Sequence, residues 1–274
     1  MHHKNFVALV LLTAICSDSS RSDSQSEPFK IVVPLIRAHA HNDYEHGRPL
    51  FDALERGFCS IEADVWLVDG QLLVAHDRHQ VKSERTLQTL YLDPLRERVR
   101  RNGGRVYANG PEIVLLVDVK SEAEKTYAAL REVLKPYSDV LTTYRVGSIQ
   151  TNAIRVVISG NRAAKMMEAE SLRHAFLDGR IADLEGGESG SLIPLVSDDW
   201  NRIFKWRWNR PMPEEELLKL KQLVDKTHSQ GRRLRFWATP DNPETWATLY
   251  DAGVDLINTD DLEGLKQFLL DRKK

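Results

Sequence analysis

The sequence has few cysteines and no marked excess of either charge. Only two cysteines, Cys16 and Cys59, occur among its 274 residues. Removal of the N-terminal segment described below would leave Cys59 alone, so no intrachain disulfide is expected and a packed core must stabilise the chain. The formal net charge of -2 provides no broad basic surface, which excludes a general nucleic-acid-binding role. Any phosphate group that the protein binds must be held locally.

Long apolar runs are also absent, apart from one short run near the N-terminus. Residues 6–15 are apolar, follow Lys4, and are too short to span a bilayer. We interpret residues 1–18 as a secretory signal peptide and residues 19–28 as a polar linker, which predicts a secreted or periplasmic protein with no transmembrane segment in the mature chain. Lipoprotein anchoring through Cys16 is an alternative, but the bulky Ile15 before it disfavours this.

Strand-like and helix-like segments alternate over residues 29–272. The expected strands are residues 31–36, 60–67, 71–75, 113–119, 144–149, 154–158, 180–184, 192–196, 233–238 and 255–258. The expected helices are residues 49–56, 86–101, 122–134, 214–230, 243–252 and 262–272. Asp69-Gly70 predicts a tight hairpin turn. The alternation favours an α/β protein with a (β/α)₈ TIM-barrel fold, with a doubly wound sheet as the alternative.

Acidic residues occur on strands that are otherwise apolar. Glu62 and Asp64 lie two residues apart and therefore face the same side of their strand. Two carboxylates in an apolar interior repel each other unless a cation neutralises them, so we expect a divalent ion. Asp118 is the candidate third ligand, and oxygen ligands favour Mg²⁺ or Ca²⁺. The alternative is an edge strand whose acids point to solvent.

Basic and aromatic side chains follow the same strands. His39, His41 and His76 are candidates for acid/base catalysis, although a single histidine is more often a core residue. Lys120, two residues after Asp118, is suited to hold a phosphoryl oxygen, and a structural ion pair would have the same sequence. Trp237 could form a wall of a substrate pocket or belong to the core. Two roles are open to Trp200, Trp206 and Trp208: a cover over the site, or an apolar surface for a peripheral membrane contact or a partner.

Together these motifs resemble the phosphatidylinositol-phospholipase-C-like phosphodiesterase superfamily, which includes the glycerophosphodiester phosphodiesterases and the sphingomyelinase D group. Its barrels carry a histidine after the first strand, Glu-x-Asp on the second, His-Asp soon after, and a carboxylate-x-Lys motif later. The corresponding positions here are His39 or His41, Glu62 and Asp64, His76-Asp77, and Asp118-Val119-Lys120. Residues 235–239 and 253–260 are similar to the closing strands. Within the superfamily, the chain most resembles the fungal altered-inheritance-of-mitochondria group.

The resemblance implies a divalent-metal-dependent phosphoric diester hydrolase, of glycerophosphodiester or phospholipid head-group type. The metal would be held by Glu62, Asp64 and Asp118, and histidines would transfer protons. Asn42, Lys120 and Trp237 would contact a small-molecule or phospholipid-derived diester. The arginine that glycerophosphodiesterases place after the first histidine is Ala40 here, so the choice between His39 and His41 stays open. A metal-dependent amidohydrolase and a non-catalytic barrel that binds a phosphorylated ligand are the alternatives.

Overall fold

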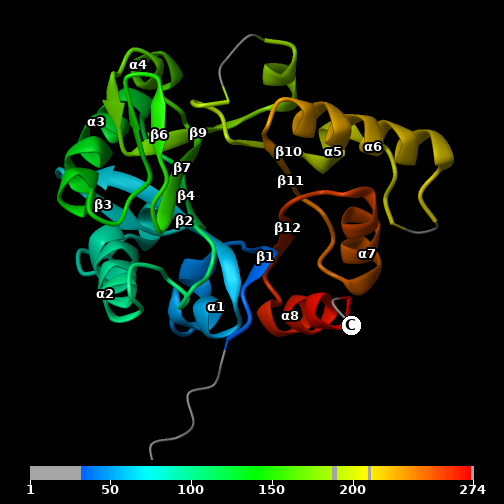
Figure 1. The fold of residues 1–274 in the computed structure, drawn as a ribbon, viewed down its shortest axis with the longest axis horizontal. Helices are drawn as coiled ribbons and strands as arrows, with labels where there is room; N and C mark the ends of the chain where they lie inside the picture. Colours follow the sequence, from blue (N-terminus) through cyan, green and yellow to red (C-terminus); the bar gives the residue numbers. More distant parts are fainter. Residues whose placement is uncertain (1–31, 187–189, 209–210, 273–274) are drawn as a thin grey trace, which may run out of the picture. The chain divides into compact units, whose positions relative to one another are not determined.

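Eight parallel strands form a ring, which confirms the (β/α)₈ barrel (Figure 1). The computed structural model describes residues 32–186, 190–208 and 211–272. Around the ring the order is β11-β10-β9-β7-β4-β2-β1-β12, and a parallel bridge between Arg235 and Leu256 joins its two ends. The ring strands are β1 (Leu35–Ala40), β2 (Phe58–Val68), β4 (Ile113–Val119), β7 (Ile154–Gly160), β9 (Ala175–Gly179), β10 (Leu195–Asp199), β11 (Arg233–Trp237) and β12 (Ile257–Thr259).

Helices surround the ring. They are α1 (Phe51–Glu55), α2 (Asp93–Arg101), α3 (Ala123–Leu134), α4 (Ala164–Glu168), α5 (Trp200–Ile203), α6 (Glu214–Ser229), α7 (Pro243–Ala252) and α8 (Leu262–Asp271). Shorter 3₁₀ turns cover Asp43–Glu45, Arg78–Gln80, Lys135–Tyr137 and Ile181–Leu184, and a π-helical turn covers Gln88–Leu92. The π turn precedes α2, where Pro94 occupies the first helical turn that tolerates proline, so the long helix predicted over 86–101 restarts at this point.

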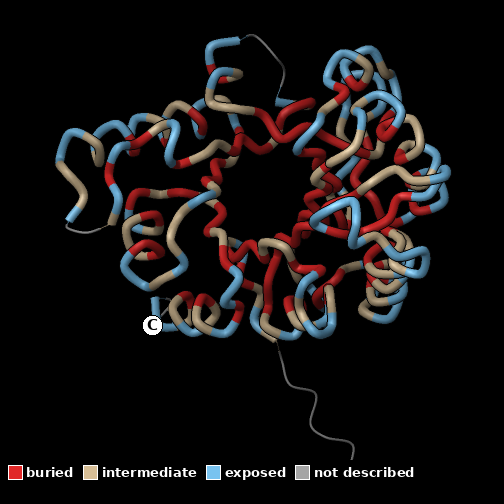
Figure 2. Tube along the Cα trace, turned by 180° about the vertical axis from the view of Figure 1, so that it is seen from behind, coloured by how far each residue is buried: buried red, intermediate tan, exposed pale blue. Residues whose placement is uncertain are grey.

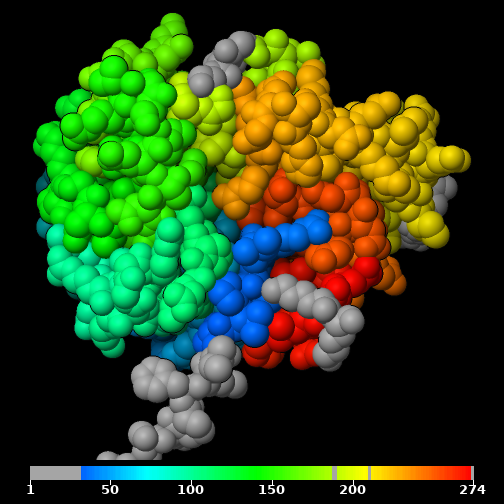
Figure 3. Space-filling view, in the orientation of Figure 1, coloured from blue at the N-terminus to red at the C-terminus, as the bar shows by residue number. Residues whose placement is uncertain are grey.

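Apolar side chains fill the interior of the ring. One buried cluster joins side chains from neighbouring ring strands and the residue before β12: Val114, Leu116, Val157, Phe176, Leu195 and Leu256. Each side chain of this size contributes about 1.5–3 kcal/mol when it is fully buried. Figure 2 shows buried residues concentrated around the ring and exposed residues on the outer helices. The space-filling view of Figure 3 shows that packed atoms occupy the region that looks open in the ribbon.

Two hairpins accompany the ring. The predicted turn at Asp69-Gly70 is confirmed, because β3 (Gln71–Val74) pairs antiparallel with β2. The single strand predicted over 144–149 is wrong. It is a hairpin of β5 (Thr143–Arg145) and β6 (Ser148–Gln150) that also pairs with β8 (Leu172–Arg173). Val146 and Gly147 both have positive φ and reverse the chain, and Tyr144 and Ile149 pack against the interior cluster.

Three ring strands differ from prediction. Strand β1 starts directly after Pro34 and extends to Ala40, so His39 lies within the strand and not beyond its end. Strand β10 begins directly after Pro194, three residues later than predicted, because proline cannot donate a ladder hydrogen bond. The strand predicted over 180–184 is a 3₁₀ turn, and the actual strand, β9, ends just before it.

The remaining predicted elements agree closely with the structure. Strand β4 has the predicted bounds, and Glu122 caps α3 by accepting hydrogen bonds from two backbone N–H groups. Among the described residues, no helix is both long and apolar enough to cross a bilayer. The signal peptide and linker predicted for residues 1–28 lie outside the described residues.

Candidate active site

The three predicted acids meet at the carboxyl ends of neighbouring strands. Strands β2 and β4 pair in parallel, and their register sets Asp64 directly beside Asp118. Glu62 lies two residues earlier on β2 and faces the same side. One carboxylate oxygen from each of these residues lies within 4.8 Å of the others. The three acids could therefore bind one divalent ion. We call them the acidic triad.

Two oxygens of the acidic triad are buried without a hydrogen-bond partner. They are Asp64 Oδ1 and Asp118 Oδ1. A buried carboxylate oxygen normally has a partner, because leaving it unpaired costs about 1–3 kcal/mol or more. Oxygen-only ligands in this arrangement suit Mg²⁺ or Ca²⁺. The residues present therefore fit a hard divalent cation.

Gly160 at the end of β7 makes room for Asp118. The backbone there has φ +67°, and a Cβ atom added at this position would lie 1.9 Å from Asp118 Oδ1. Only a residue without a side chain permits this approach. The close packing of these two strands thus positions one member of the acidic triad.

Lys120 and Arg235 offset part of the acidic charge. Lys120 Nζ lies 2.7 Å from Asp118 Oδ2 and 3.0 Å from Asp64 Oδ2. Burial lowers the pKa of Lys120, but the two acids outweigh it and raise the value to about 12. Burial, with Glu62 nearby, raises the pKa of Asp64 to about 6. The triad thus has three carboxyl groups and two bonded cations, Lys120 and Arg235.

His39 is buried in the barrel interior and contacts Glu62 of the acidic triad. It has no exposed surface, and its Nδ1 lies 2.7 Å from Ser60 Oγ. Its Nε2 lies 2.8 Å from Glu62 Oε2 and 2.5 Å from Arg235 Nη1. Burial lowers the pKa of His39 to about 4. Both ring nitrogens are thus occupied, and this geometry favours a supporting role for His39 over proton transfer to a substrate.

Arg235 forms an ion pair with Glu62, the acid that contacts His39. Its Nη1 donates to Glu62 Oε2 over 2.9 Å, and both residues are buried. Burial alone would raise the pKa of Glu62, but the charge of Arg235 and the hydrogen bond with His39 lower it overall. Glu62 is therefore a carboxylate with a fixed orientation.

His41 lies at the end of the first strand and contacts the end of the last. Its backbone N–H donates to Thr259 O over 3.0 Å, and its Nδ1 lies 2.8 Å from Asp260 Oδ1. Because a carboxylate can only accept, Nδ1 carries the proton and Nε2 is left for a substrate. Burial lowers the pKa of His41, but the bond to Asp260 and the charge of Glu62 outweigh it and raise the value.

His76 lies on the other side of Asp64. Its Nδ1 is 3.2 Å from Asp64 Oδ2 and 3.1 Å from the Tyr44 hydroxyl. That hydroxyl lies 2.7 Å from Asp64 Oδ2 and 2.8 Å from Asn42 Oδ1, so its one proton serves one of them at a time. The side chain of His76 is 50% exposed, so a substrate can reach it. The structure therefore brings His41, His76 and Asn42 to the rim of the triad.

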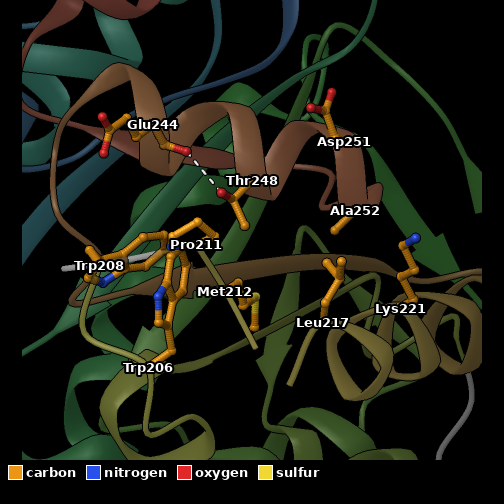
Figure 4. Close-up of a pocket in the computed structure, with 10 residues that line it drawn as sticks. All are labelled: Trp206, Trp208, Pro211, Met212, Leu217, Lys221, Glu244, Thr248, Asp251 and Ala252. Atoms are coloured by element: carbon orange, nitrogen blue, oxygen red, sulfur yellow. Dashed lines mark hydrogen bonds between the residues drawn. The ribbon is translucent and has the colours of Figure 1, made fainter. Parts of the chain in front are cut away.

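The tryptophans occupy different places. Trp237 ends β11 and is half-buried. Trp200 is fully buried and packs against Phe204 and Phe236. Trp206 and Trp208 line a groove of about 740 Å³ between α6 and α7, and no member of the acidic triad lines it (Figure 4). Two roles were predicted for this cluster. The contact with a membrane or a partner stays a prediction, and the position of the groove does not support a cover over the active site.

Three residues of the site were not assigned roles from the sequence. Asp260 directly follows β12, so the rule that polar residues at strand ends converge could have found it. Tyr44 lies within the His-Asn-Asp-Tyr motif. Arg235 alternates with apolar residues on β11, where an interior charge requires a buried partner.

Comparison with known proteins agrees with this fold. A family model described as the AIM6-like phosphodiesterase domain matches residues 28–178, and one for the glycerophosphoryl diester phosphodiesterase family matches residues 233–263. The altered inheritance of mitochondria protein 6 homolog of Arthroderma benhamiae is 28% identical over 86% of this chain and 84% of its own. The Lachancea thermotolerans protein of that name is 32% identical over 85% of this chain and 65% of its own.

Solved structures share the fold at low sequence identity. A glycerophosphodiester phosphodiesterase from Parabacteroides distasonis superposes with a TM-score of 0.52 at 16% identity, over 87% of this chain and 98% of that one. Another, from Agrobacterium tumefaciens, has a TM-score of 0.50 at 14% identity, over 88% of this chain and 100% of that one. The two family models and the barrel fold place the chain in the glycerophosphodiester phosphodiesterase and phospholipase-C-like superfamily. Within it, the chain belongs to the AIM6-like phosphodiesterase domain family.

Proposed function

We propose that this protein is a divalent-metal-dependent phosphodiesterase that cleaves small or phospholipid-derived diesters of the glycerophosphodiester type. The observation that carries the proposal is the acidic triad, whose oxygens lie within 4.8 Å of one another and include two buried ones with no partner. The family to which the chain belongs supports phosphodiester chemistry. An ion held by Glu62, Asp64 and Asp118 would neutralise charge on the phosphate.

The protein's own residues would then supply proton transfer. His41 Nε2 removes a proton from the attacking hydroxyl, and Asp260 stabilises the imidazolium that results. As the new P–O bond forms and the old one breaks, His76 gives a proton to the departing alkoxide. Lys120 holds a non-bridging phosphate oxygen, and Asn42 and Trp237 contact the substrate. The attacking hydroxyl comes from water or from the substrate itself.

The two alternatives have less support. A metal-dependent amidohydrolase needs histidine ligands, whereas the one possible metal-binding group found among the described residues consists only of carboxylates. A non-catalytic barrel would not need His41 and His76 beside the triad with a ring nitrogen left for a substrate.

Leaving groups of different acidity test the proposed roles. Alkyl glycerophosphodiesters need a general acid, whereas bis(p-nitrophenyl) phosphate has a good leaving group and does not. His76→Gln should lose at least a hundredfold in rate on the alkyl diester and less than tenfold on the activated one. His41→Gln should lose rate on both, and the exposed His79→Gln serves as control. Equal losses on both substrates for His76→Gln would overturn its role, and no cleavage by the wild type would overturn the function.

A further inference from the structure

The carboxylate of Asp241 accepts four hydrogen bonds from residues outside its own turn. It lies between β11 and α7, and its Oδ1 accepts from Trp246 Nε1 over 2.9 Å and from Thr259 Oγ1 over 2.6 Å. Its Oδ2 accepts from the backbone N–H groups of Asp260 and Asp261 over 2.7 and 2.9 Å. All four donors point at one carboxylate; one of them comes from Thr259, the last residue of β12, and two come from the loop that follows it.

The end of β12 and the first residue of the following loop both contact His41. Thr259 accepts the backbone N–H of His41, and Asp260 accepts the proton of its Nδ1. Asp260 itself is exposed, with 64% of its side chain accessible to solvent, so no surrounding core fixes its orientation. The backbone N–H of Asp260 is held by Asp241, and the neighbouring residues on both sides are held by the same carboxylate. The direction of the Asp260 side chain is therefore set from the loop after β11.

We propose that Asp241 is a positioning residue, which holds Asp260 against His41 and thereby fixes the ring orientation and the protonated nitrogen of His41. The inference rests on the proposed function only where it concerns the rate. The hydrogen bonds described for Asp241 go to Trp246, Thr259, Asp260 and Asp261, and not to His41 or the acidic triad. An orientation error at His41 lowers the rate of proton transfer more than it lowers substrate binding.

The test compares Asp241→Asn with Asn242→Ala. The amide keeps the shape of the carboxylate but turns an NH₂ group toward at least one pair of donors. Asn242 is the adjacent residue and caps α7 through a bond from Thr245 N–H, so its loss weakens the same loop without touching Asp260.

We expect Asp241→Asn to lower kcat five- to fiftyfold with KM changed less than twofold. Asn242→Ala should lower the urea midpoint while kcat stays within twofold of the wild type. Thr259→Val, which removes one bond to Asp241 from the other side, should lower kcat two- to fivefold.

A double-mutant cycle and an NMR signal distinguish positioning from general destabilisation. If Asp241 acts through Asp260, then Asp241→Asn should lower kcat less than twofold in an Asp260→Asn background. The His41 Nδ1 proton, assigned by its loss in His41→Gln, should give a downfield NMR signal in the wild type and in Asn242→Ala. The signal should be lost or shifted upfield in Asp241→Asn and Asp260→Asn.

The NMR signal decides the inference even if no diester is cleaved, so a failure of the proposed function is separable from a failure of this one. A downfield signal in Asp241→Asn identical to that of the wild type would overturn the inference. Its absence from the wild type, or additive losses of kcat in the cycle, would do the same.

Discussion

Replacement of Gly160 by alanine should weaken metal binding through a steric effect on Asp118. An ideal Cβ at this position would lie 1.9 Å from Asp118 Oδ1 and 2.5 Å from Val119 O. Non-bonded carbon and oxygen atoms approach no closer than about 3 Å, so the carboxylate must leave its place in the acidic triad. The variant changes no ligand and no charge.

Gly231 provides a matched control for the backbone strain. It has φ +68°, against +67° at Gly160, and nothing lies within 4 Å of its added Cβ. Alanine in the left-handed region costs about 1–2 kcal/mol at either position. Gly160→Ala additionally breaks the pair of Asp118 with Lys120, a partly exposed pair that contributes about 1 kcal/mol at most. Loss of one carboxylate from the triad should weaken Mg²⁺ or Ca²⁺ binding about tenfold or more, which corresponds to about 1.4 kcal/mol.

Calorimetric titration with each ion, urea unfolding and diester turnover measured on both variants test this reasoning. We expect Gly160→Ala to lose more stability than Gly231→Ala, because its Cβ also clashes with the backbone oxygen of Val119, and we expect a loss of ion affinity only in Gly160→Ala. If Gly160→Ala binds ions and turns over substrate as Gly231→Ala does, the assigned role of Asp118 is wrong.

Three further predictions concern charged side chains. Burial raises the pKa of Asp43 from 3.8 to about 6, so its folded state favours the protonated acid. The stability of the wild type relative to Asp43→Asn should therefore fall by about 1–3 kcal/mol as pH rises from 4 to 8 in urea titrations, and a constant difference would contradict this. Lys120→Met removes a cation that competes for two of the three acids, so calorimetry should show severalfold tighter Mg²⁺ binding while turnover falls at least tenfold; unchanged affinity would show that the lysine does not compete. Arg235→Met leaves Glu62 buried without its cationic partner and should lower the free energy of unfolding by about 3–5 kcal/mol, whereas a loss under about 1 kcal/mol would refute a buried ion pair.

Much of the fold could be predicted because periodicity and turn residues act locally. The apolar run that forms β4 and the Asp69-Gly70 hairpin both have the predicted bounds within a residue. The errors arose where tertiary contacts decide. Val146 adopts a positive φ that its branched side chain disfavours, because the hairpin places its neighbours against the interior cluster. No local sequence pattern predicts that these packing contacts offset the unfavourable backbone conformation of Val146.

The clustering of the three acids was predictable from the sequence, but the roles of the histidines and the contributions of Asp260, Tyr44 and Arg235 were not. Alternation along β2 placed Glu62 and Asp64 together, and strand register in the structure sets the predicted third ligand, Asp118, beside Asp64. The same logic could not separate His39 from His41, because the distinction depends on where β1 ends. Four more residues of strand move His39 into the buried layer and leave His41 at the rim.

Occupancy of the acidic triad, measured together with turnover, tests the central claim most directly. Metal-stripped protein is dialysed against increasing Mg²⁺ or Ca²⁺, and bound ion and diester cleavage are measured on the same samples. We predict one ion per chain, a rate that rises in proportion to occupancy, and the loss of both in Asp64→Asn. Full activity in the stripped protein, or bound ion in Asp64→Asn equal to that in the wild type, would contradict the claim.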